Sequence, residues 1–209
     1  IGGLQWRDWP DTGGVPLVAD MSSDIMSRPL PVKKFGIIYA GAQKNLGPAG
    51  ATIVIIRNDI VENSADDLPA YLSYKTHVSK EGLYNTPPVF SVWGIKLVLE
   101  WIKEMGGTEV MAERAERKSS KIYDTIDGSG GFYKCPVDPN YRSRMNVVFR
   151  LPTEDLEKQF VKEAEENGML GLKGHRSVGG CRASNYNSLP EEMVDALTDF
   201  MKEFAKKNS

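Results

Sequence analysis

The chain has 209 residues, of which 41% are hydrophobic and 26% are charged, and its formal net charge is −2 at pH 7. This length is enough for one large domain or two small ones with a real core, and the composition is that of an ordinary globular protein. The small net charge gives no electrostatic reason to expect a nucleic-acid or anionic-membrane partner, and no apolar run approaches the ~20 residues of a membrane span. We therefore expect neither partner.

Neither the first residues nor the cysteines indicate secretion or a metal site. The opening stretch, IGGLQWRDWPDTGG, has neither the basic region nor the apolar core of a signal peptide. Cys135 and Cys181 lie far apart and follow no metal or redox spacing. We therefore expect reduced thiols, a cytoplasmic location and no bound metal.

A short apolar strand is the first predicted element. It covers Val15–Asp20, after an irregular lead-in, and Met21–Pro31 follows as a loop rich in serine and proline. Ser22 and Ser23 in this loop could donate hydrogen bonds to a phosphate. They could equally be ordinary turn residues, and we favour the turn.

Two further strands flank a turn that carries a single lysine. The β-branched, apolar runs Ile37–Tyr39 and Thr52–Ile56 predict buried strands, and Lys44 lies between them among glycine and proline. Partial burial at the edge of a core can lower the pKa of such an amine and make it nucleophilic. Asp20 and Lys44 each close a strand, 24 residues apart, and a pyridoxal phosphate enzyme needs such a pair of acid and lysine. The alternatives are a solvated lysine and a turn-capping aspartate.

The next stretch contains one long predicted helix. Residues 58–80 are polar and predict loop and short helix, and Leu83–Pro88 is a segment stiffened by two prolines. Apolar residues at helical spacing then predict a helix over Val89–Met105. We interpret its aromatic stripe as core or subunit interface rather than as a cofactor platform. Gly106 and Gly107 end this helix and mark the best candidate domain boundary.

The second half predicts a helix over Thr108–Ile126 and then a β-β-α-β-β-α order, which is a small α+β domain. The exposed face of that helix is expected to be a solvated charged surface, comprising Glu113, Arg114, Glu116, Arg117 and Lys118. The later elements are strands at Gly131–Cys135 and Arg144–Leu151, a helix capped by Thr153 that runs to Asn167, short strands near Leu170 and Arg182, and a closing helix at Pro190–Lys206.

A basic, glycine-rich loop separates those last two short strands. Lys173, His175, Arg176 and Arg182 lie within ten positions of one another, spaced by glycines. Glycines let a backbone approach a ligand closely, and paired arginines bind phosphate or carboxylate through two parallel hydrogen bonds. The alternatives are an anion site and a basic surface turn.

Four segments together resemble the phosphoserine aminotransferase family, in its order along the chain. They are ADMSSDIMSRP, YAGAQKNLGPAG, LYNTPP and LKGHRSVGGCRASNYN. The resemblance covers the later part of the family's sequence. It implies an α/β fold: residues 1–105 as the C-terminal part of a fold-type I large domain, with a mostly parallel sheet and helices, and 106–209 as a small C-terminal α+β domain.

The resemblance also implies a pyridoxal 5'-phosphate site. Lys44 corresponds to the Schiff-base lysine, Gln43 to a cofactor contact, and Asp20 to the acid that pairs with the pyridine nitrogen. Asn85 and Thr86 resemble the pair that reaches the cofactor phosphate of the neighbouring subunit, which implies a homodimer. The implied roles of Lys44 are nucleophile and proton shuttle.

The implied substrates are phosphoserine and 2-oxoglutarate, or in reverse 3-phosphohydroxypyruvate and glutamate, in serine biosynthesis. His175, Arg176 and Arg182 map to recognition of the substrate phosphate. One alternative is a fold-type I aminotransferase for a non-phosphorylated substrate. Another is a catalytically silent dimerisation or binding module, because the family's glycine-rich phosphate cradle, stacking aromatic ring, cofactor threonine and substrate-carboxylate arginine lie in the part that the resemblance does not cover.

Overall fold

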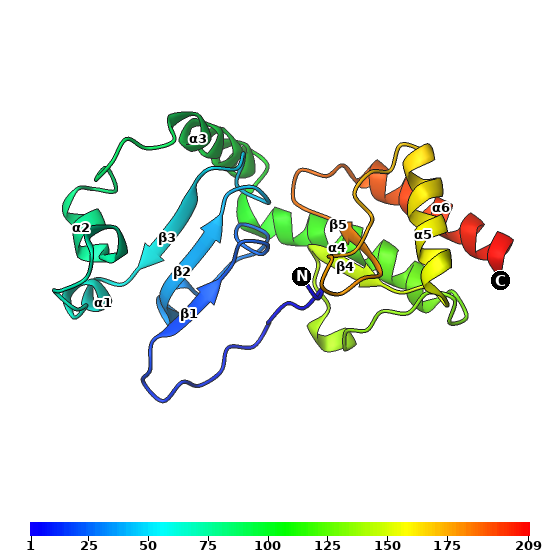
Figure 1. Ribbon diagram of the computed structural model, residues 1–209, viewed down its shortest axis with the longest axis horizontal. Helices are drawn as coiled ribbons and strands as arrows, with labels where there is room; N and C mark the ends of the chain where they lie inside the picture. Colours follow the sequence, from blue (N-terminus) through cyan, green and yellow to red (C-terminus); the bar gives the residue numbers. More distant parts are fainter. The chain divides into compact units, whose positions relative to one another are not determined.

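A computed structural model describes all 209 residues and divides the chain into two compact units. The first, here called the sheet unit, is Pro10–Thr108, and the second, the α+β unit, joins Ile1–Trp9 to Glu109–Ser209 (Figure 1). These units differ from the predicted domains, 1–105 and 106–209, in where the N-terminal residues belong. The backbone amide of Gln5 donates to the carbonyl of Tyr141 at 2.8 Å, and this long-range pairing attaches the N-terminus to the α+β unit.

The sheet unit contains three strands in the order β1-β2-β3. Strand β1 (Leu17–Asp20) runs parallel to β2 (Phe35–Gly41), and β2 runs antiparallel to β3 (Thr52–Ile56). The predicted α/β class is confirmed, and the three predicted strands are present. Because β2 and β3 are joined only by the lysine-bearing turn, their connection is too short for a parallel crossover.

The helices of the sheet unit follow β3. They are α1 (Asn58–Glu62), α2 (Tyr74–Ser79) and α3 (Val89–Glu104), with short 3-10 turns at Val32–Lys34 and Ala70–Leu72. Helix α3 buries Ile95 and Ile102, whereas Phe90 and Trp93 are exposed at 70% and 54%. The aromatic stripe is therefore not part of the core of this chain, and its role as a subunit interface stays a prediction.

The α+β unit contains long helices and one short two-stranded sheet. Its elements are α4 (Gly107–Asp127), a 3-10 turn (Pro139–Tyr141), β4 (Asn146–Phe149), α5 (Glu154–Glu166), β5 (Cys181–Ser184) and α6 (Glu191–Asn208), with β4 antiparallel to β5. Glycine 107 begins α4, although we predicted that it ends the preceding helix. No helix of the chain is long and apolar enough to cross a membrane.

Two of the predicted strands are absent from the α+β unit. The stretches 131–135 and around Leu170 contribute only single bridges, Lys134 to Arg150 and Lys173 to Cys181. Gly131 has a φ of +91° and Gly171 a φ of +79°, and such left-handed positions interrupt an extended strand. The predicted β-β-α-β-β-α order is wrong in these two places.

An aromatic cluster holds the core of this unit together. Phe160 on α5 is fully buried, and its ring centroid lies 5.6 Å from that of Phe149 and 5.2 Å from that of Phe204, both edge to face. Tyr133 packs against the same rings, and its hydroxyl donates to the carbonyl of Met201 at 2.8 Å. Edge-to-face pairs add to area burial, so this cluster joins β4, α5 and α6.

Lys118 corrects the prediction of a fully solvated face on α4. Its side chain is 1% exposed, and its ammonium donates to the carbonyls of Tyr186 at 2.8 Å and Leu189 at 2.9 Å. Burial, and secondarily the charge of Arg114, lowers the pKa of Lys118 to about 8, against an opposing effect of Glu191. This lysine therefore anchors the segment that leads into α6.

The predicted cap of α5 is confirmed and allows a stability prediction. The hydroxyl of Thr153 accepts from the amide of Leu156 at 3.2 Å, which satisfies one of the unpaired donors at the start of the helix. Thr153→Ala is expected to lower the free energy of unfolding by about 1 kcal/mol in urea titrations. Thr153→Ser keeps the acceptor and should remain close to the unmodified chain; equal losses in both variants would contradict the capping role.

Candidate active site

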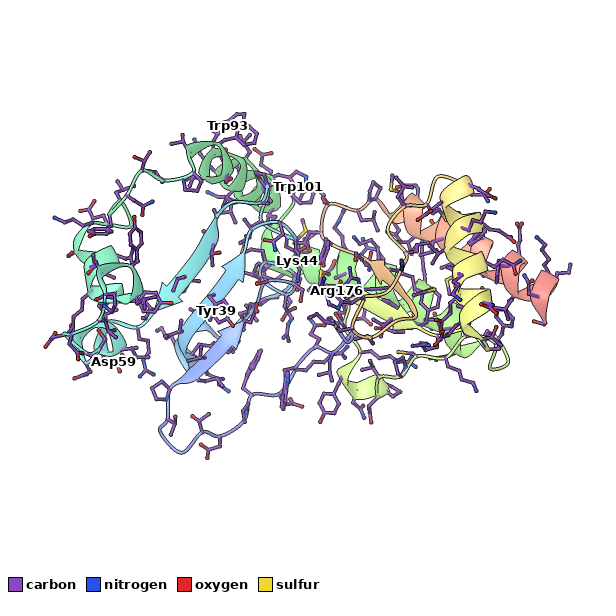
Figure 2. The ribbon with its side chains drawn as sticks, viewed as in Figure 1. Tyr39, Lys44, Asp59, Trp93, Trp101 and Arg176 are labelled. Carbon is purple, nitrogen blue, oxygen red and sulfur yellow. The ribbon has the colours of Figure 1, made fainter.

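The ends of β1 and β2 are tied together beside the lysine-bearing turn. Asp20 is the last residue of β1 and pairs in register with Tyr39 of β2. The amide of Ser22 donates to a carboxylate oxygen of Asp20 at 2.8 Å, and the amide of Gly41 donates to the hydroxyl of Ser22 at 3.0 Å. Ser22 therefore serves the turn, as favoured from the sequence, and links the two strand ends. Lys44 follows directly after this linked edge (Figure 2).

The electrostatics of this edge favour a carboxylate anion. Partial burial opposes ionisation of Asp20, but the hydrogen bonds from Ser22 and the positive charge of Lys44 outweigh it, so the pKa of Asp20 is lowered. Lys44 itself is half-buried. The structure thus brings the predicted acid and the predicted amine within electrostatic reach of each other, at the same end of adjacent parallel strands.

The turn that carries Lys44 is held by close packing on α3. Gly47 and Gly50 have positive φ values of +146° and +113°, and a β-carbon at Gly50 would lie 2.9 Å from the hydroxyl of Ser91. The same hydroxyl of Ser91 donates to the carbonyl of Ala49 at 2.8 Å. A side chain at Gly94 would also meet the ring of Pro48 at 2.7 Å. These contacts explain why glycine and proline surround the lysine.

The two residues beside Lys44, Gln43 and Asn45, differ in burial and in their contacts. Gln43 is exposed, and its amide group lies over Gly41, where an added β-carbon would be 2.6 Å from the side-chain oxygen of Gln43. Asn45 is buried and donates to the carbonyl of Ser23 at 3.2 Å. We did not predict a role for Asn45. The sequence offered only one indication, a polar residue close to the end of an apolar strand. The hydrogen-bond partner of Asn45 lies 22 positions upstream, so the sequence pattern does not reveal it.

Asn85 and Thr86 lie apart from this edge. Both are exposed on the segment before α3, and the amide of Asn85 donates to the carbonyl of Thr86 at 3.1 Å. No hydrogen bond links this pair to Asp20 or Lys44. Their assignment to a cofactor phosphate of a second copy therefore stays a prediction.

The predicted anion-binding loop lies in the α+β unit. The amides of Val178 and Gly179 both donate to the carbonyl of His175, at 2.9 and 2.8 Å, and the amide of Gly174 donates to the carbonyl of Gly180 at 2.8 Å. The amide of Ser177 also donates to Nδ1 of His175 at 3.3 Å. Nδ1 also lies 2.7 Å from the hydroxyl of Ser177, so this ring nitrogen is engaged within the loop.

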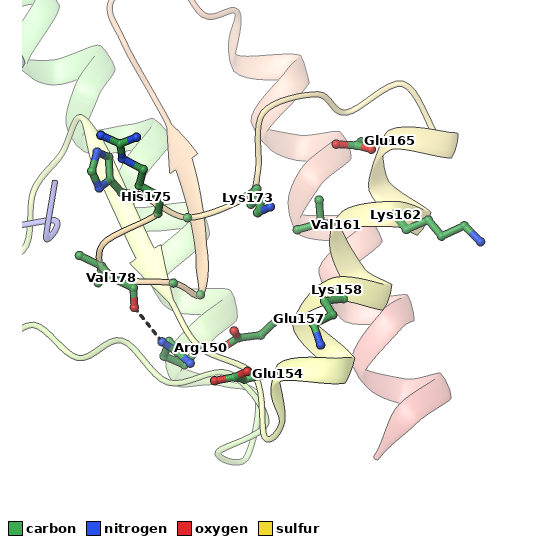
Figure 3. A pocket seen from close by; sticks show the side chains of 14 residues that line it. Arg150, Glu154, Glu157, Lys158, Val161, Lys162, Glu165, Lys173, His175 and Val178 are labelled. Atoms are coloured by element: carbon green, nitrogen blue, oxygen red, sulfur yellow. Dashed lines mark hydrogen bonds and ion pairs between the residues drawn. The ribbon is translucent and has the colours of Figure 1, made fainter.

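A cavity of about 630 Å³ lies between this loop and α5 (Figure 3). Cations and carboxylates both line it. The basic and acidic residues are Arg150, Lys158, Lys162, Lys173, His175, Arg176, Glu154, Glu157 and Glu165. In Figure 3 the ring of His175 points away from α5, so this side chain is directed to the outer side of the loop.

Arg182 has an unpaired guanidinium nitrogen. Arg182 lies on β5 and pairs in register with Val148 of β4, and its backbone amide donates to the carbonyl of Leu172 at 2.8 Å. The side chain is half-buried, and its Nε is buried without a hydrogen-bond partner in the chain. Nε of Arg114, Arg142 and Arg144 is buried in the same way, so this atom alone does not distinguish Arg182 as a ligand-binding residue. His175, Arg176 and Arg182 are thus close in sequence within one unit, and the Asp20–Lys44 edge lies in the other.

The comparisons with known proteins support one family over nearly the whole chain. Residues 10–197 match the family described as aminotransferase class-V. A phosphoserine aminotransferase of Lysinibacillus sphaericus is 55% identical over 208 residues, covering 100% of this chain and 58% of that protein. One from Desulfosudis oleivorans is 56% identical over 209 residues, with the same coverage.

Solved structures agree with this assignment. Phosphoserine aminotransferase from Bacillus circulans subsp. alkalophilus superimposes with a TM-score of 0.96 at 54% identity, covering 100% of this chain and 58% of that one. A phosphoserine aminotransferase from Trichomonas vaginalis described as bound to PLP matches with a TM-score of 0.90 at 40% identity, covering 96% and 57%. The chain spans about 58% of the length of the curated relatives cited here. The predicted resemblance is confirmed: the chain belongs to the class-V aminotransferase family.

Proposed function

We propose that this chain forms the lysine-bearing part of a phosphoserine aminotransferase that uses pyridoxal phosphate. In the proposed reaction, phosphoserine gives its amino group to 2-oxoglutarate, which yields 3-phosphohydroxypyruvate and glutamate, and the reaction is reversible. It would be a step of serine biosynthesis in the cytoplasm. The observation that carries the proposal is the acid and amine pair, Asp20 and Lys44, held at one edge of the sheet with the pKa of Asp20 lowered. Identity above half to phosphoserine aminotransferases supports the substrate.

The residues at the strand edge fit this cofactor. Pyridoxal phosphate supplies an aldehyde that condenses with amines and a ring that takes up electrons from the substrate carbon. Asp20 would hold a proton on the ring nitrogen, because its own pKa is lowered and it stays anionic. Gln43 would contact the ring, and Asn85 and Thr86 would bind the phosphate in a second copy of the chain. A homodimer is therefore part of the proposal.

Lys44 would carry the proton transfers. Its Nζ would take a proton from the α carbon of the amino-acid substrate and later return one to complete the exchange. Half-burial and a turn packed on α3 restrict where this amine can move. Fixing a general base in this way lowers the entropic cost of reaching the reactive geometry.

Substrate selection would belong to the loop in the α+β unit. His175, Arg176 and Arg182 supply donors for a phosphate, and the Nε of Arg182 is buried without a partner in the chain. The cationic side chains of this loop would bind a phosphate through charge-assisted hydrogen bonds, whereas serine carries no phosphate for them to bind. This difference favours phosphoserine over serine.

The chain alone is expected to bind little cofactor, because the family's glycine-rich phosphate cradle and stacking ring lie in the part that it does not cover. The first test is therefore a visible spectrum, with added pyridoxal phosphate, of the completed protein, which we define as this chain joined to the part of the Lysinibacillus sphaericus relative that the chain does not cover. We expect an absorption band that depends on Lys44 and changes when glutamate or phosphoserine is added. Lys96→Ala, which removes an exposed lysine of α3 that pairs only with Glu100, is the matched control and should keep the band. Absence of the band from the completed protein with Lys44 intact would favour the alternative of a binding or dimerisation module.

The second test concerns the substrate. This test also uses the completed protein. The completed protein is expected to use phosphoserine at least about 100-fold better than serine in kcat/KM, because a site built for a charged group rejects the analogue that lacks it. Comparable use of both amino acids would instead support an aminotransferase for non-phosphorylated substrates.

A further inference from the structure

Arg150 is connected to the Lys173–Gly180 loop more closely than its distance in sequence suggests. It follows β4, and its Nη1 donates to the carbonyl of Val178 at 3.1 Å, across 28 positions of the chain (Figure 3). Val178 lies in the same hydrogen-bonded turn whose amides donate to His175. One guanidinium thus touches the turn that presents His175 and Arg176.

The other side of the guanidinium is held by a buried carboxylate. Nε of Arg150 lies 2.6 Å from Glu157, whose side chain is 9% exposed, and Glu157 also accepts from the amide of Leu151 at 3.3 Å. The backbone of Arg150 is itself fixed, because it exchanges two hydrogen bonds with Lys134, at 3.0 and 2.8 Å. Arg150 is therefore anchored on α5 and β4 while it reaches the loop.

The glycines of the loop are shaped to the same side chain. Gly179 and Gly180 have φ values of +74° and +70°. A β-carbon at Gly180 would lie 2.6 Å from Cδ of Arg150 and 2.9 Å from the carbonyl of Phe149. A β-carbon at Gly179 would lie 3.2 Å from Nη1 of Arg150. The backbone of the loop thus rests directly on the stem and head of this arginine.

We infer that Arg150 and Glu157 are positioning residues that fix the loop bearing His175 and Arg176, so that these two side chains are held ready for the substrate anion. This inference rests on the proposed function for the identity of the anion. Arg150 is assigned to positioning because Glu157 neutralises its charge at Nε and the carbonyl of Val178 accepts from Nη1. Its effect passes through the backbone of the loop.

Arg150→Met tests the inference because it keeps a long apolar stem and removes the guanidinium. In the completed protein we expect the KM for phosphoserine to rise about tenfold while kcat changes less than about twofold, because a loosened loop weakens substrate binding. Partial unfolding would instead lower the active fraction and hence kcat. Arg150→Lys keeps a cation for Glu157 but not the fork that also reaches Val178, so its KM should rise as well; a KM equal to that of the unmodified protein in either variant would overturn the inference.

Amide hydrogen exchange of the purified chain supplies a second measurement that needs no substrate. Arg150→Met should accelerate exchange at Val178 and Gly179 about tenfold and leave exchange in α6 unchanged. The matched control is Lys158→Met, which removes a neighbouring cavity cation that is 73% exposed and pairs only with Asp155. Unchanged exchange at Val178 and Gly179 would refute the positioning role even if the protein proves to be a phosphoserine aminotransferase. Faster exchange in a protein that does not transaminate phosphoserine would support the positioning and refute the proposed function.

Discussion

Lys44→Ala in the completed protein is expected to lower kcat for amino-group transfer from phosphoserine by about 10³-fold or more. Under the proposed function, the substitution removes both the amine that would condense with the cofactor and the base that would move the proton at the substrate α carbon. No other lysine is placed with Asp20 at this strand edge, where the charge of Lys44 helps to lower the pKa of the carboxylate. Steady-state assays with 2-oxoglutarate as acceptor measure this loss.

Two controls separate chemistry from folding in this experiment. Lys96→Ala should retain activity, because Lys96 is 68% exposed and contacts only Glu100 on the same helix. Urea unfolding of Lys44→Ala should give nearly the unmodified midpoint, since the amine of Lys44 makes no hydrogen bond that the packing of the turn on α3 depends on. A Lys44→Ala protein with more than about a tenth of the unmodified kcat would rule out its assignment as the essential base.

Lys118→Met is expected to lower the free energy of unfolding by about 2–4 kcal/mol at pH 7. Methionine fills a similar volume but donates nothing, so the carbonyls of Tyr186 and Leu189 lose their buried donor. Both carbonyls belong to the segment that begins α6, and the loss should therefore loosen the start of that helix. Denaturant titration of the purified chain measures the change. Lys202→Met, at a lysine of α6 that is 63% exposed and pairs with Asp199, is the control and should cost little.

The same lysine makes stability depend on pH in a direction that can be worked out. Burial lowers the pKa of Lys118 from 10.5 to about 8 in the folded chain, so between these values the unfolded chain binds more protons than the folded one. The free energy of unfolding therefore rises with pH across this window, by an amount on the order of 2 kcal/mol. This rise in the free energy of unfolding begins near pH 8 and is complete near pH 10.5.

The difference between the unmodified chain and Lys118→Met isolates this effect. Because methionine does not titrate, the destabilisation caused by the substitution should be larger at pH 10 than at pH 7. Exposed lysines and tyrosines titrate equally in both proteins and cancel in the difference. A gap that shrinks as pH rises would show that Lys118 is stabilised in its charged form by the two carbonyls and that burial is the weaker effect.

Much of the fold follows from the sequence because it depends on local patterns. Apolar β-branched runs predict the three strands of the sheet unit, helical spacing predicts α3, and Thr153 predicts the start of α5. The candidate residues Asp20 and Lys44 also follow from local order, since Asp20 ends a strand and Lys44 lies in the turn after the next one. Glycine and proline around Lys44 predict a tight turn, because few other residues adopt its backbone angles or leave room for α3.

The tertiary structure decided the features whose partners lie far away in the chain. Lys118 stands in a charged run and differs from its neighbours only because two carbonyls about 70 positions later face it in the fold. Arg150 supports the basic loop through a carbonyl 28 positions away, and the N-terminal residues join the α+β unit by pairing with Tyr141. The periodicity of a sequence predicts which face of a helix or strand is apolar. It does not predict which distant backbone group will contact a given side chain.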